Sequence, residues 1–461
     1  MVNRNSWSSR TIANHYIRLR RIPDRNVIFL DYEGGVERLP LDQFLSEILT
    51  PIQIEVRRRN LGGQIRYIAY SSDFPYAIDF SSRLAAAGRL GALQSLPNVA
   101  QFPDASLTSL TYLHHTIGTR GTEFADLRVN TEDMGGFVGR QTQGKRRFSG
   151  TERRRTDRDL GNFPLAAVLG YTAGRGNSVH EIVSYLRRAA LSDRTHPEGE
   201  FYFMRNDDIR SKVRAPEFQQ IVRVLRSVGL TAYIEEGAVP PAGRRVLGAM
   251  LGISDFVWDS ECRIVPGAIC ENFTSFGGIL NEASPQTPLT QLLRLGAVGS
   301  TGTVIEPFAI AEKFPHPAMH AHYVQGCTLA ESVYQSVLGP YQLLLVGDPL
   351  CRPWGVAPQV QIEGIANPTA VRGDLELSPR VVAPRGYEVK QIEWYLDGDL
   401  HTTRGVKEAW KLDTRTLGDG HHALTALALT DTAIGHEGRR DVSLFVTNGE
   451  QRVECVRQGN A

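Results

Sequence analysis

The sequence predicts an α/β domain with a mostly parallel sheet, followed by an all-β sandwich. Within residues 1–355, short apolar runs alternate with amphipathic helical stretches, which is typical of a doubly wound sheet. Over residues 356–450 apolar residues recur at every second position between turn signals, which is typical of a β-sandwich. We therefore expect two domains and a tail at 451–461 in this chain of 461 residues.

The first expected element is a helix that begins after Ser6, with Ile12 and Tyr16 on its apolar face. A short buried strand follows at Asn26–Tyr32. A helix that leads into a buried parallel strand normally has a strand before it, and residues 1–3 are too few for one. We therefore expect a first strand, together with an export signal, upstream of Met1.

The alternation continues up to about residue 100. Leu41–Asn60 is helical in pattern, and Pro51 predicts that this helix is kinked or split. Ile65–Tyr70 is expected to be a strand that ends at a polar turn, and Ser82–Leu96 a helix.

Residues 100–163 lose this periodicity and contain eight Lys and Arg residues within 140–158. A phosphate-binding loop is one interpretation. Acidic residues interleave with the cations and no aromatic platform accompanies them, so a solvated surface insertion is the favoured interpretation.

Strands and helices then resume in regular order. The expected strands are 165–171, 200–205, 230–235, 246–251, 268–273, 297–304 and 342–346. The expected helices are 178–190, 215–228, 287–296 and 319–337. The glycine-rich turn between the strand at 165–171 and its helix could bind an anion at the N-terminus of that helix. An ordinary tight turn explains its glycines better.

The C-terminal region changes to a period of two. Val389–Leu396 is expected to place Ile392, Trp394 and Leu396 on one face and to end at the turn Asp397–Gly398. Together with its Trp strand and the run DGHHALTALA, this region resembles bacterial Ig-like modules, which space or anchor a partner domain outside the cytoplasm. His421 and His422 lack a third candidate ligand, so a strand edge explains them better than a metal site.

Composition excludes several classes of protein. Lys plus Arg total 51 and Asp plus Glu total 50, which argues against a nucleic-acid binder. No apolar stretch approaches the roughly 18 residues that a membrane span requires. Five cysteines in 461 residues exclude a disulfide framework. We expect no cofactor, and the sequence leaves metal binding and oligomeric state open.

Cys270 is the strongest candidate for a chemical role. It is expected at the carboxyl end of a strand, where open α/β sheets place reactive groups. Ser275, Gly277 and Gly278 follow it, and their backbone amides are candidates for an oxyanion site.

Several motifs support a family resemblance over most of residues 1–355. They are NRNS (3–6), IPDRNV (22–27), TSFGG (274–278), QTPLT (286–290), GAVGSTGTVIEP (296–307) and VGDPLCRP (346–353). With these motifs the chain resembles a bacterial secreted family related to the gingipain-like, caspase-like cysteine peptidases. The resemblance implies a caspase-like sheet, an extracytoplasmic location and a nucleophilic role for Cys270, but no established activity.

The same resemblance implies a histidine at the end of the strand that precedes the Cys strand. In this chain that strand is followed by Gly252-Ile253-Ser254-Asp255, and none of the twelve histidines lies between His196 and His316. A thiol with an ordinary pKa of about 8.5 needs a base or a positive field to react at neutral pH. The favoured interpretation makes Cys270 a small buried hydrophobe.

Polar residues at the predicted strand ends are expected to share one rim of the sheet, where a crevice would bind a ligand. The candidate binding residues are Ser72, Asp73, Arg175, Asn177, Glu271, Asn272, Ser275 and Glu306. Glu306 and Asp348 are also candidates for a cation site, although Asp348 before Pro349 is better explained as a turn cap.

Three functional hypotheses remain. The first is a catalytically degenerate peptidase domain that binds a protein or peptide outside the cytoplasm. The second is an active cysteine peptidase or hydrolase that uses Cys270 with a relocated base. The third is a metal-assisted hydrolase built on the acidic rim residues, for which the sequence offers only scattered carboxylates.

Overall fold

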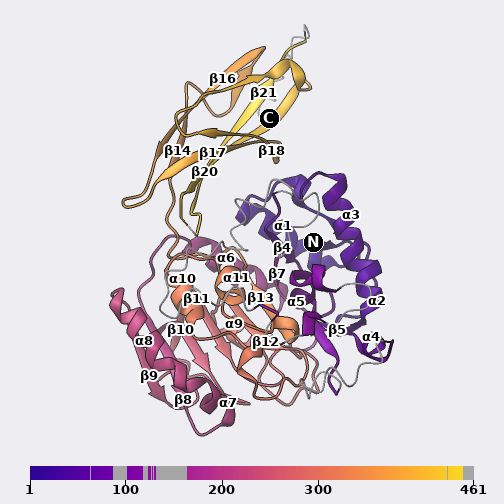
Figure 1. Ribbon diagram of the computed structural model, residues 1–461, viewed down its shortest axis with the longest axis vertical. Helices are drawn as coiled ribbons and strands as arrows, with labels where there is room; N and C mark the ends of the chain where they lie inside the picture. Colours follow the sequence, from indigo (N-terminus) through magenta and orange to yellow (C-terminus); the bar gives the residue numbers. More distant parts are fainter. Residues whose placement is uncertain are drawn as a thin grey trace, which may run out of the picture. The chain divides into compact units, whose positions relative to one another are not determined.

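The structure, a computed structural model, describes residues 1–62, 64–86, 101–117, 123–125, 127, 129–130, 164–432 and 434–449. The chain divides into two compact units, and each is described by itself (Figure 1). The first comprises Met1–Ile22 and Val27–Gly355, and the second comprises Pro23–Asn26 and Val356–Ala461. The Arg-rich run at 140–158, the tail at 451–461 and most of the helix expected at 82–96 lie outside the described residues.

An eight-stranded sheet forms the centre of the first unit. Its strands, in order across the sheet, are β4 (Tyr67–Tyr70), β7 (Leu165–Val168), β13 (Leu343–Gly347), β12 (Gly299–Thr303), β11 (Arg263–Asn272), β10 (Arg245–Leu251), β8 (Glu200–Arg205) and β9 (Thr231–Glu236). All bonded neighbours are parallel except β12 and β13, which are antiparallel. The predicted α/β class with a mostly parallel sheet is confirmed.

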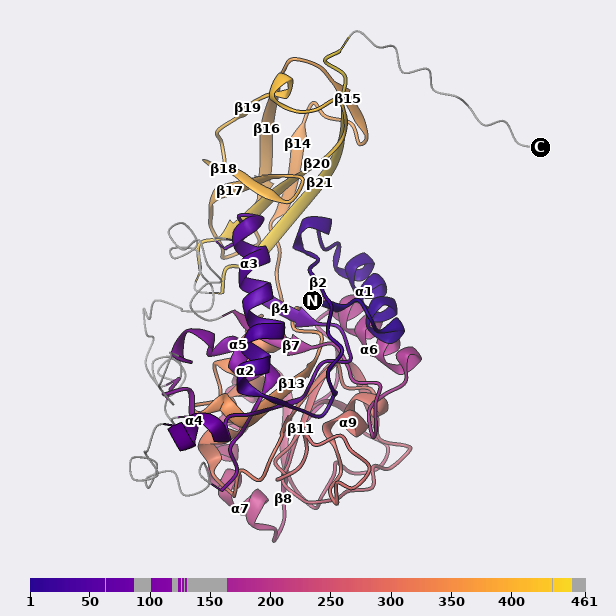
Figure 2. The same ribbon diagram turned by 90° about the vertical axis from the view of Figure 1, so that its right-hand side faces the viewer.

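Helices cover both faces of this sheet. Figure 2 shows α1 (Trp7–Arg20), α6 (Val179–Ser192) and α9 (Leu289–Leu295) on one side and α5 (Leu107–Tyr112) on the other. The remaining longer helices are α3 (Thr50–Arg58), α7 (Ile209–Arg214), α8 (Phe218–Ser227), α10 (Ala318–Val324) and α11 (Leu329–Tyr334). The central strand β13 is apolar apart from its final Gly347, and its five residues are all buried.

The N-terminal segment corrects one premise of the sequence analysis. Val2–Asn3 forms a two-residue strand, β1, which pairs in parallel with β2 (Phe29–Leu30) across α1. Residues 1–3 are therefore long enough to supply the strand of a βαβ unit. The expectation of an upstream segment with an export signal stays a prediction.

Two predicted helices differ from their expected form, each for a local reason. The stretch 41–60 consists of α2 (Leu41–Gln43), a π-helical turn (Phe44–Leu49) and α3, and Pro51 is the second residue of α3. The helix type changes next to Pro51, but the backbone stays helical, so the stretch is not split there. The helix expected at 319–337 is instead α10 and α11, separated at Gly326, whose φ of 95° ends the first helix.

A small sheet was not predicted at all. It contains β3 (Arg38–Pro40), β5 (Ala77–Asp79) and β6 (Asp104–Ser106), with α4 (Ser81–Ala86) between the last two. Its three-residue strands are too short to show alternation in a sequence.

The second unit is built from two antiparallel-rich sheets. One contains β14 (Gln359–Glu363), β16 (Asp374–Val382) and β19 (Trp410–Asp413), and the other contains β15 (Thr369–Val371), β21 (Glu437–Val446), β20 (Gly420–Thr430), β17 (Val389–Leu396) and β18 (Asp399–Gly405). Ile392, Trp394 and Leu396 are buried as predicted. Positive φ angles of 51° at Asp397 and 83° at Gly398 form the predicted hairpin turn.

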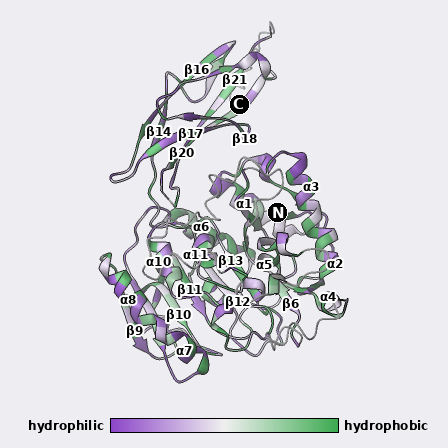
Figure 3. Cartoon of the chain, viewed as in Figure 1, coloured by the Kyte–Doolittle hydropathy of each residue, from purple (hydrophilic) through white to green (hydrophobic). Residues whose placement is uncertain are grey.

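Each unit has its own hydrophobic core. Figure 3 shows hydrophobic residues along the central strands, while outer helices such as α8 carry both hydrophobic and hydrophilic residues. Among the described residues, no helix has both the length and the apolar character needed to cross a bilayer.

Candidate functional site

The thiol of Cys270 lies inside the sheet. Strand β11 continues for two residues beyond Cys270, to Asn272, and the Cys270 side chain is fully buried beside Ala249 of β10. Burial raises the pKa of this thiol well above its ordinary value. Cys270 thus lies near the carboxyl end of its strand, but its buried environment suppresses the thiolate that a nucleophile requires.

His320 is buried against this part of the sheet, but it lies on the other face. A Cβ added to Gly248 would lie 2.7 Å from Cε1 of His320, so the imidazole packs directly on Gly248. Gly248 pairs with Ile269, whereas Cys270 pairs with Ala249. Since successive residues of a strand point to opposite faces, His320 and Cys270 cannot form a dyad.

Asn272 binds the loop after β10, which is the position at which the family resemblance implies a histidine. Its side-chain amide donates to the carbonyl of Ile253 at 2.9 Å and accepts from the amide of Ile253 at 3.2 Å. The loop after β10 is thereby attached to the end of β11. Asn272 is a structural clamp rather than a free binding group.

Of the three predicted oxyanion amides, the one of Gly278 already has a partner within the protein. The amide of Gly278 donates to the carbonyl of Thr303 at 2.9 Å, and the carbonyl of Ser275 accepts from the hydroxyl of Thr303 at 2.9 Å. The amide of Phe276 donates to Oε1 of Gln286 at 2.9 Å. These contacts fold the loop after β11 onto β12 and leave the amides of Phe276 and Gly278 no free donor for an oxyanion.

Glu271 forms a buried ion pair with Arg214, the last residue of α7. Glu271 is 0% exposed and Arg214 is 5% exposed. Burial raises the pKa of Glu271, while the neighbouring guanidinium acts in the opposite direction. Nη1 of Arg214 also donates to the carbonyl of Leu251 at 3.1 Å, so the pair ties α7 to the ends of β10 and β11.

Ser72 and Asp73 belong to a cluster of hydroxyl groups at the end of β4. The carboxylate of Asp73 accepts from the hydroxyls of Ser6, of Ser72 at 2.9 Å and of Thr172 at 2.8 Å. Asp73 has a positive φ of 58°, which Asp tolerates better than most residues. The cluster joins the segment before α1 to the loops after β4 and β7.

Arg175 and Asn177 attach the loop after β7 to the segment that leads into α9. Nη1 of Arg175 donates to the carbonyls of Ser284 and Gln286, both at 2.7 Å, and Nδ2 of Asn177 donates to the carbonyl of Thr290 at 3.2 Å. The structure therefore brings these two predicted residues together, and both hold the loop after β7 against the segment around the start of α9.

The start of α6 has no vacancy for an anion. Ser178 caps the helix, its hydroxyl accepts from the amide of Glu181, and the Glu181 carboxylate accepts from the amide of Ser178 at 2.7 Å. This capping box supplies the negative charge that the helix N-terminus favours. The capping box is compatible with the favoured interpretation of the glycine-rich segment as an ordinary tight turn.

Glu306 and Asp348 do not form a common cation site. The Glu306 carboxylate accepts from the amide of Phe308 at 2.7 Å, which caps a turn. Asp348 accepts from the amide of Leu350 at 3.1 Å, as its predicted capping role requires, and from Tyr16 and Arg20. Within the described ranges, no three His, Cys, Asp or Glu side chains are grouped as a metal site would require.

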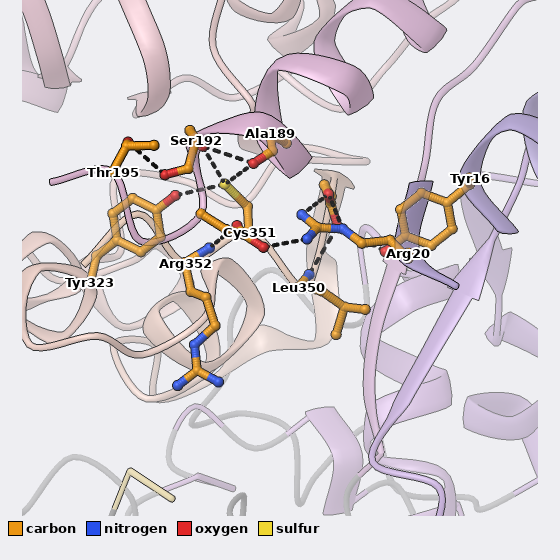
Figure 4. Close-up of polar contacts among 11 residues, drawn as sticks. Tyr16, Arg20, Ala189, Ser192, Thr195, Tyr323, Leu350, Cys351 and Arg352 are labelled. Carbon is orange, nitrogen blue, oxygen red and sulfur yellow. Dashed lines mark hydrogen bonds and ion pairs between the residues drawn. The ribbon is translucent and has the colours of Figure 1, made fainter. Parts of the chain in front are cut away.

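The polar network around Asp348 was missed by the sequence analysis. Tyr16 and Arg20 of α1 donate to the Asp348 carboxylate at 2.8 Å each, and Arg20 also pairs with Asp193. Figure 4 shows the neighbouring thiol of Cys351 surrounded by Ser192, Tyr323 and the carbonyl of Ala189. The VGDPLCRP motif thus binds the chain after β13 to α1 and to the end of α6. Its partners Tyr16 and Arg20 lie 332 and 328 residues away in sequence, so no local signal identifies them.

Comparisons with known proteins find distant similarities only. No family model and no curated protein matches the chain. An endo-β-1,4-mannanase from Thermotoga petrophila is 11% identical over 20% of each chain, with a TM-score of 0.17. The fibronectin(III)-like modules of CbhA from Clostridium thermocellum are 16% identical over 24% of this chain and 53% of theirs, with a TM-score of 0.18.

A third solved structure spans more of the chain. It is a nucleoside hydrolase-related hypothetical protein from Saccharophagus degradans, described as associated with carbohydrate metabolism. It is 8% identical over 90% of this chain and 100% of its own, with a TM-score of 0.19. At such TM-scores these similarities define neither fold nor function.

Proposed function

We propose that the chain is a non-catalytic relative of the gingipain-like, caspase-like peptidases, which acts outside the cytoplasm by binding a protein or peptide, with an Ig-like module as its spacer or anchor. The family assignment, the location and the Ig-like assignment rest on the motif resemblance. The α/β sheet with helices on both faces and the separate β-unit are compatible with it.

The environment of Cys270 is the observation that supports a non-catalytic role. The thiol is fully buried in β11, its pKa is raised by burial, and His320 lies across the sheet. Among the hydrogen bonds of the described residues, none joins Cys270 to a histidine. A cysteine peptidase requires an accessible thiolate beside a base, and both are missing here.

Thiol-labelling kinetics test the proposal. The folded protein is treated with iodoacetamide, and the labelling of each cysteine is followed by mass spectrometry, with a sample in urea as the control for reagent access. We expect Cys270 to react no faster than the other buried thiols, Cys262, Cys327 and Cys351, because all four lack solvent exposure. A peptide aldehyde should leave these rates unchanged.

A proteolysis assay separates the alternatives. We expect fluorescein-labelled casein to stay intact with both the wild type and the Cys270→Ala variant. Fast labelling of Cys270, protection by the aldehyde, and casein cleavage that disappears in Cys270→Ala would overturn the proposal and establish the alternative, an active cysteine peptidase.

A further inference from the structure

A second buried polar cluster lies on the face of the sheet opposite Cys270. Glu271 follows Cys270 in β11 and therefore points to the other face, the face on which His320 packs over Gly248. Arg214 reaches this face from α7 and pairs with Glu271. The three side chains come from β11, α7 and α10, and each is at least nine-tenths buried.

Each of these side chains has a buried polar atom without a hydrogen-bond partner in the part of the chain that the structure describes. These atoms are Nη2 of Arg214, Oε1 of Glu271, and both Nδ1 and Nε2 of His320. A neutral imidazole carries one N–H donor and one acceptor nitrogen, so His320 leaves two groups unsatisfied. Burying such a group without a hydrogen-bond partner costs free energy. In folded proteins nearly all buried polar groups have a partner, either in the protein or in ordered water.

Two aromatic rings flank His320. Its ring lies 5.4 Å from that of Phe201 and 5.7 Å from that of Phe203, centroid to centroid. The charge of Arg214 acts on His320 and also on His316 of the same segment. His316 in turn lies 3.4 Å from the carboxylate of Glu217 and is occupied by it.

We propose that internal water binds between Arg214, Glu271 and His320 and joins them into one hydrogen-bonded unit. Water can accept from Nη2 of Arg214, donate to Oε1 of Glu271 and bond to a ring nitrogen of His320, which satisfies donors and acceptors together. This site is independent of the proposed binding function, because it lies on the other face of the sheet from Cys270.

A double-mutant cycle tests the proposal on the full-length chain. His320→Phe keeps the ring and removes both nitrogens, and Glu271→Gln removes the charge of the carboxylate. If water joins the groups, His320→Phe lowers the folding equilibrium constant at least tenfold in urea titrations. The factor by which the folding equilibrium constant falls in the double variant is then at least threefold smaller than the product of the factors for the two single variants. His180→Phe, at an exposed position of α6, is the matched control and should change nothing.

A different set of stabilities is expected if no water binds at this site. If the nitrogens of His320 are dry, His320→Phe removes unsatisfied groups and is as stable as the wild type or more stable, and its effect multiplies with that of Glu271→Gln. That outcome overturns the proposal.

A second measurement uses the unmodified protein and does not depend on the folding of a variant. In wild-type protein labelled with ¹⁵N-histidine, one imidazole will show contacts to the rings of Phe201 and Phe203. We expect its N–H proton to cross-relax with water at pH 7. An N–H signal with those ring contacts and no water cross-peak also overturns the proposal.

Discussion

Asp348 shows how much of this fold depends on single buried charges. Its carboxylate is fully buried and accepts from a tyrosine, an arginine and a backbone amide. The arginine, Arg20, is itself only 9% exposed in its side chain and is shared with Asp193. Inside a protein such pairs are satisfied only as a complete set, because removal of one member leaves the other charge buried and uncompensated.

Asp348→Asn should therefore be strongly destabilising. We expect a loss of about 3 kcal/mol in the free energy of unfolding, since the amide cannot neutralise Arg20 and leaves it only Asp193, whose side chain is 22% exposed. Urea denaturation followed by circular dichroism measures it. The control is Asp31→Asn, which removes an exposed pair with Arg4 and should leave the midpoint unchanged. A similar midpoint for both variants would contradict the role assigned to Asp348.

Gly248 is a second residue with a specific physical requirement. An added Cβ would come within 2.6 Å of a ring carbon of Phe201 and 2.7 Å of His320. Gly248→Ala should cost about 1–3 kcal/mol through overpacking, measured by the same titration. Gly35→Ala is the control, because a Cβ there meets no atom within 4 Å. If both variants behave alike, His320 does not pack on β10 as described.

The candidate site residues were predicted by type and position but not by role. Arg175 and Asn177 follow a strand and Asn272 ends one, as expected, yet each holds a loop in place. Polar residues at strand ends serve ligands and loop contacts equally well, and the sequence does not distinguish the two uses. The partners that decide between them, such as Tyr16 for Asp348, are distant in the chain.

At the scale of elements, periodicity predicted the long amphipathic helices well. Helices α6 and α8 lie where the spacing of apolar residues placed them, and Ser178 caps α6. Short elements were missed because two or three residues show no period, as in β1 and β3. The break at Gly326 was missed because apolar residues continue on both of its sides.

Asn272 links two elements and gives a prediction at this scale. Asn272→Ala removes both hydrogen bonds that hold the loop after β10 to β11, so this loop should open locally more often. We expect faster backbone hydrogen exchange at residues 252–256, measured by mass spectrometry, with little change in β20. Asn281→Ala, which removes one long side-chain contact at a surface position, is the control. Unchanged exchange in Asn272→Ala would show that the clamp is dispensable.

The molecule has two units with separate hydrophobic cores, and each unit contains a histidine whose protonation is coupled to folding, the two in opposite senses. In the first unit, burial and the nearby charge of Arg214 lower the pKa of His320 to about 3. In the second, burial of His422 disfavours its charge, but hydrogen bonds to Asp397 and to the carbonyl of Gly418 outweigh this and raise its pKa. The two units should therefore respond to pH differently.

For His320 the direction of the pH effect on stability depends on whether the unfolded or the native state takes up a proton first as the pH falls. Above pH 6.5 the imidazole is neutral in both states, and its contribution to stability is complete. Below that value the unfolded chain binds a proton while the native core does not, so stability falls as the pH falls towards 3. The slope for one such group is about 1.4 kcal/mol per pH unit.

For His422 the order is reversed. Its contribution is complete below the unfolded pKa of about 6.5 and is lost as the pH rises through the raised pKa of the folded state. Hydrogen exchange in urea at pH 4.5, 6 and 8 can follow β11 and β20 separately. We expect acid to destabilise β11, with the dependence reduced in His320→Phe, and alkali to destabilise β20, with the dependence reduced in His422→Gln. If both strands lose protection at the same urea concentration at every pH, the two cores unfold together and neither histidine controls its own unit.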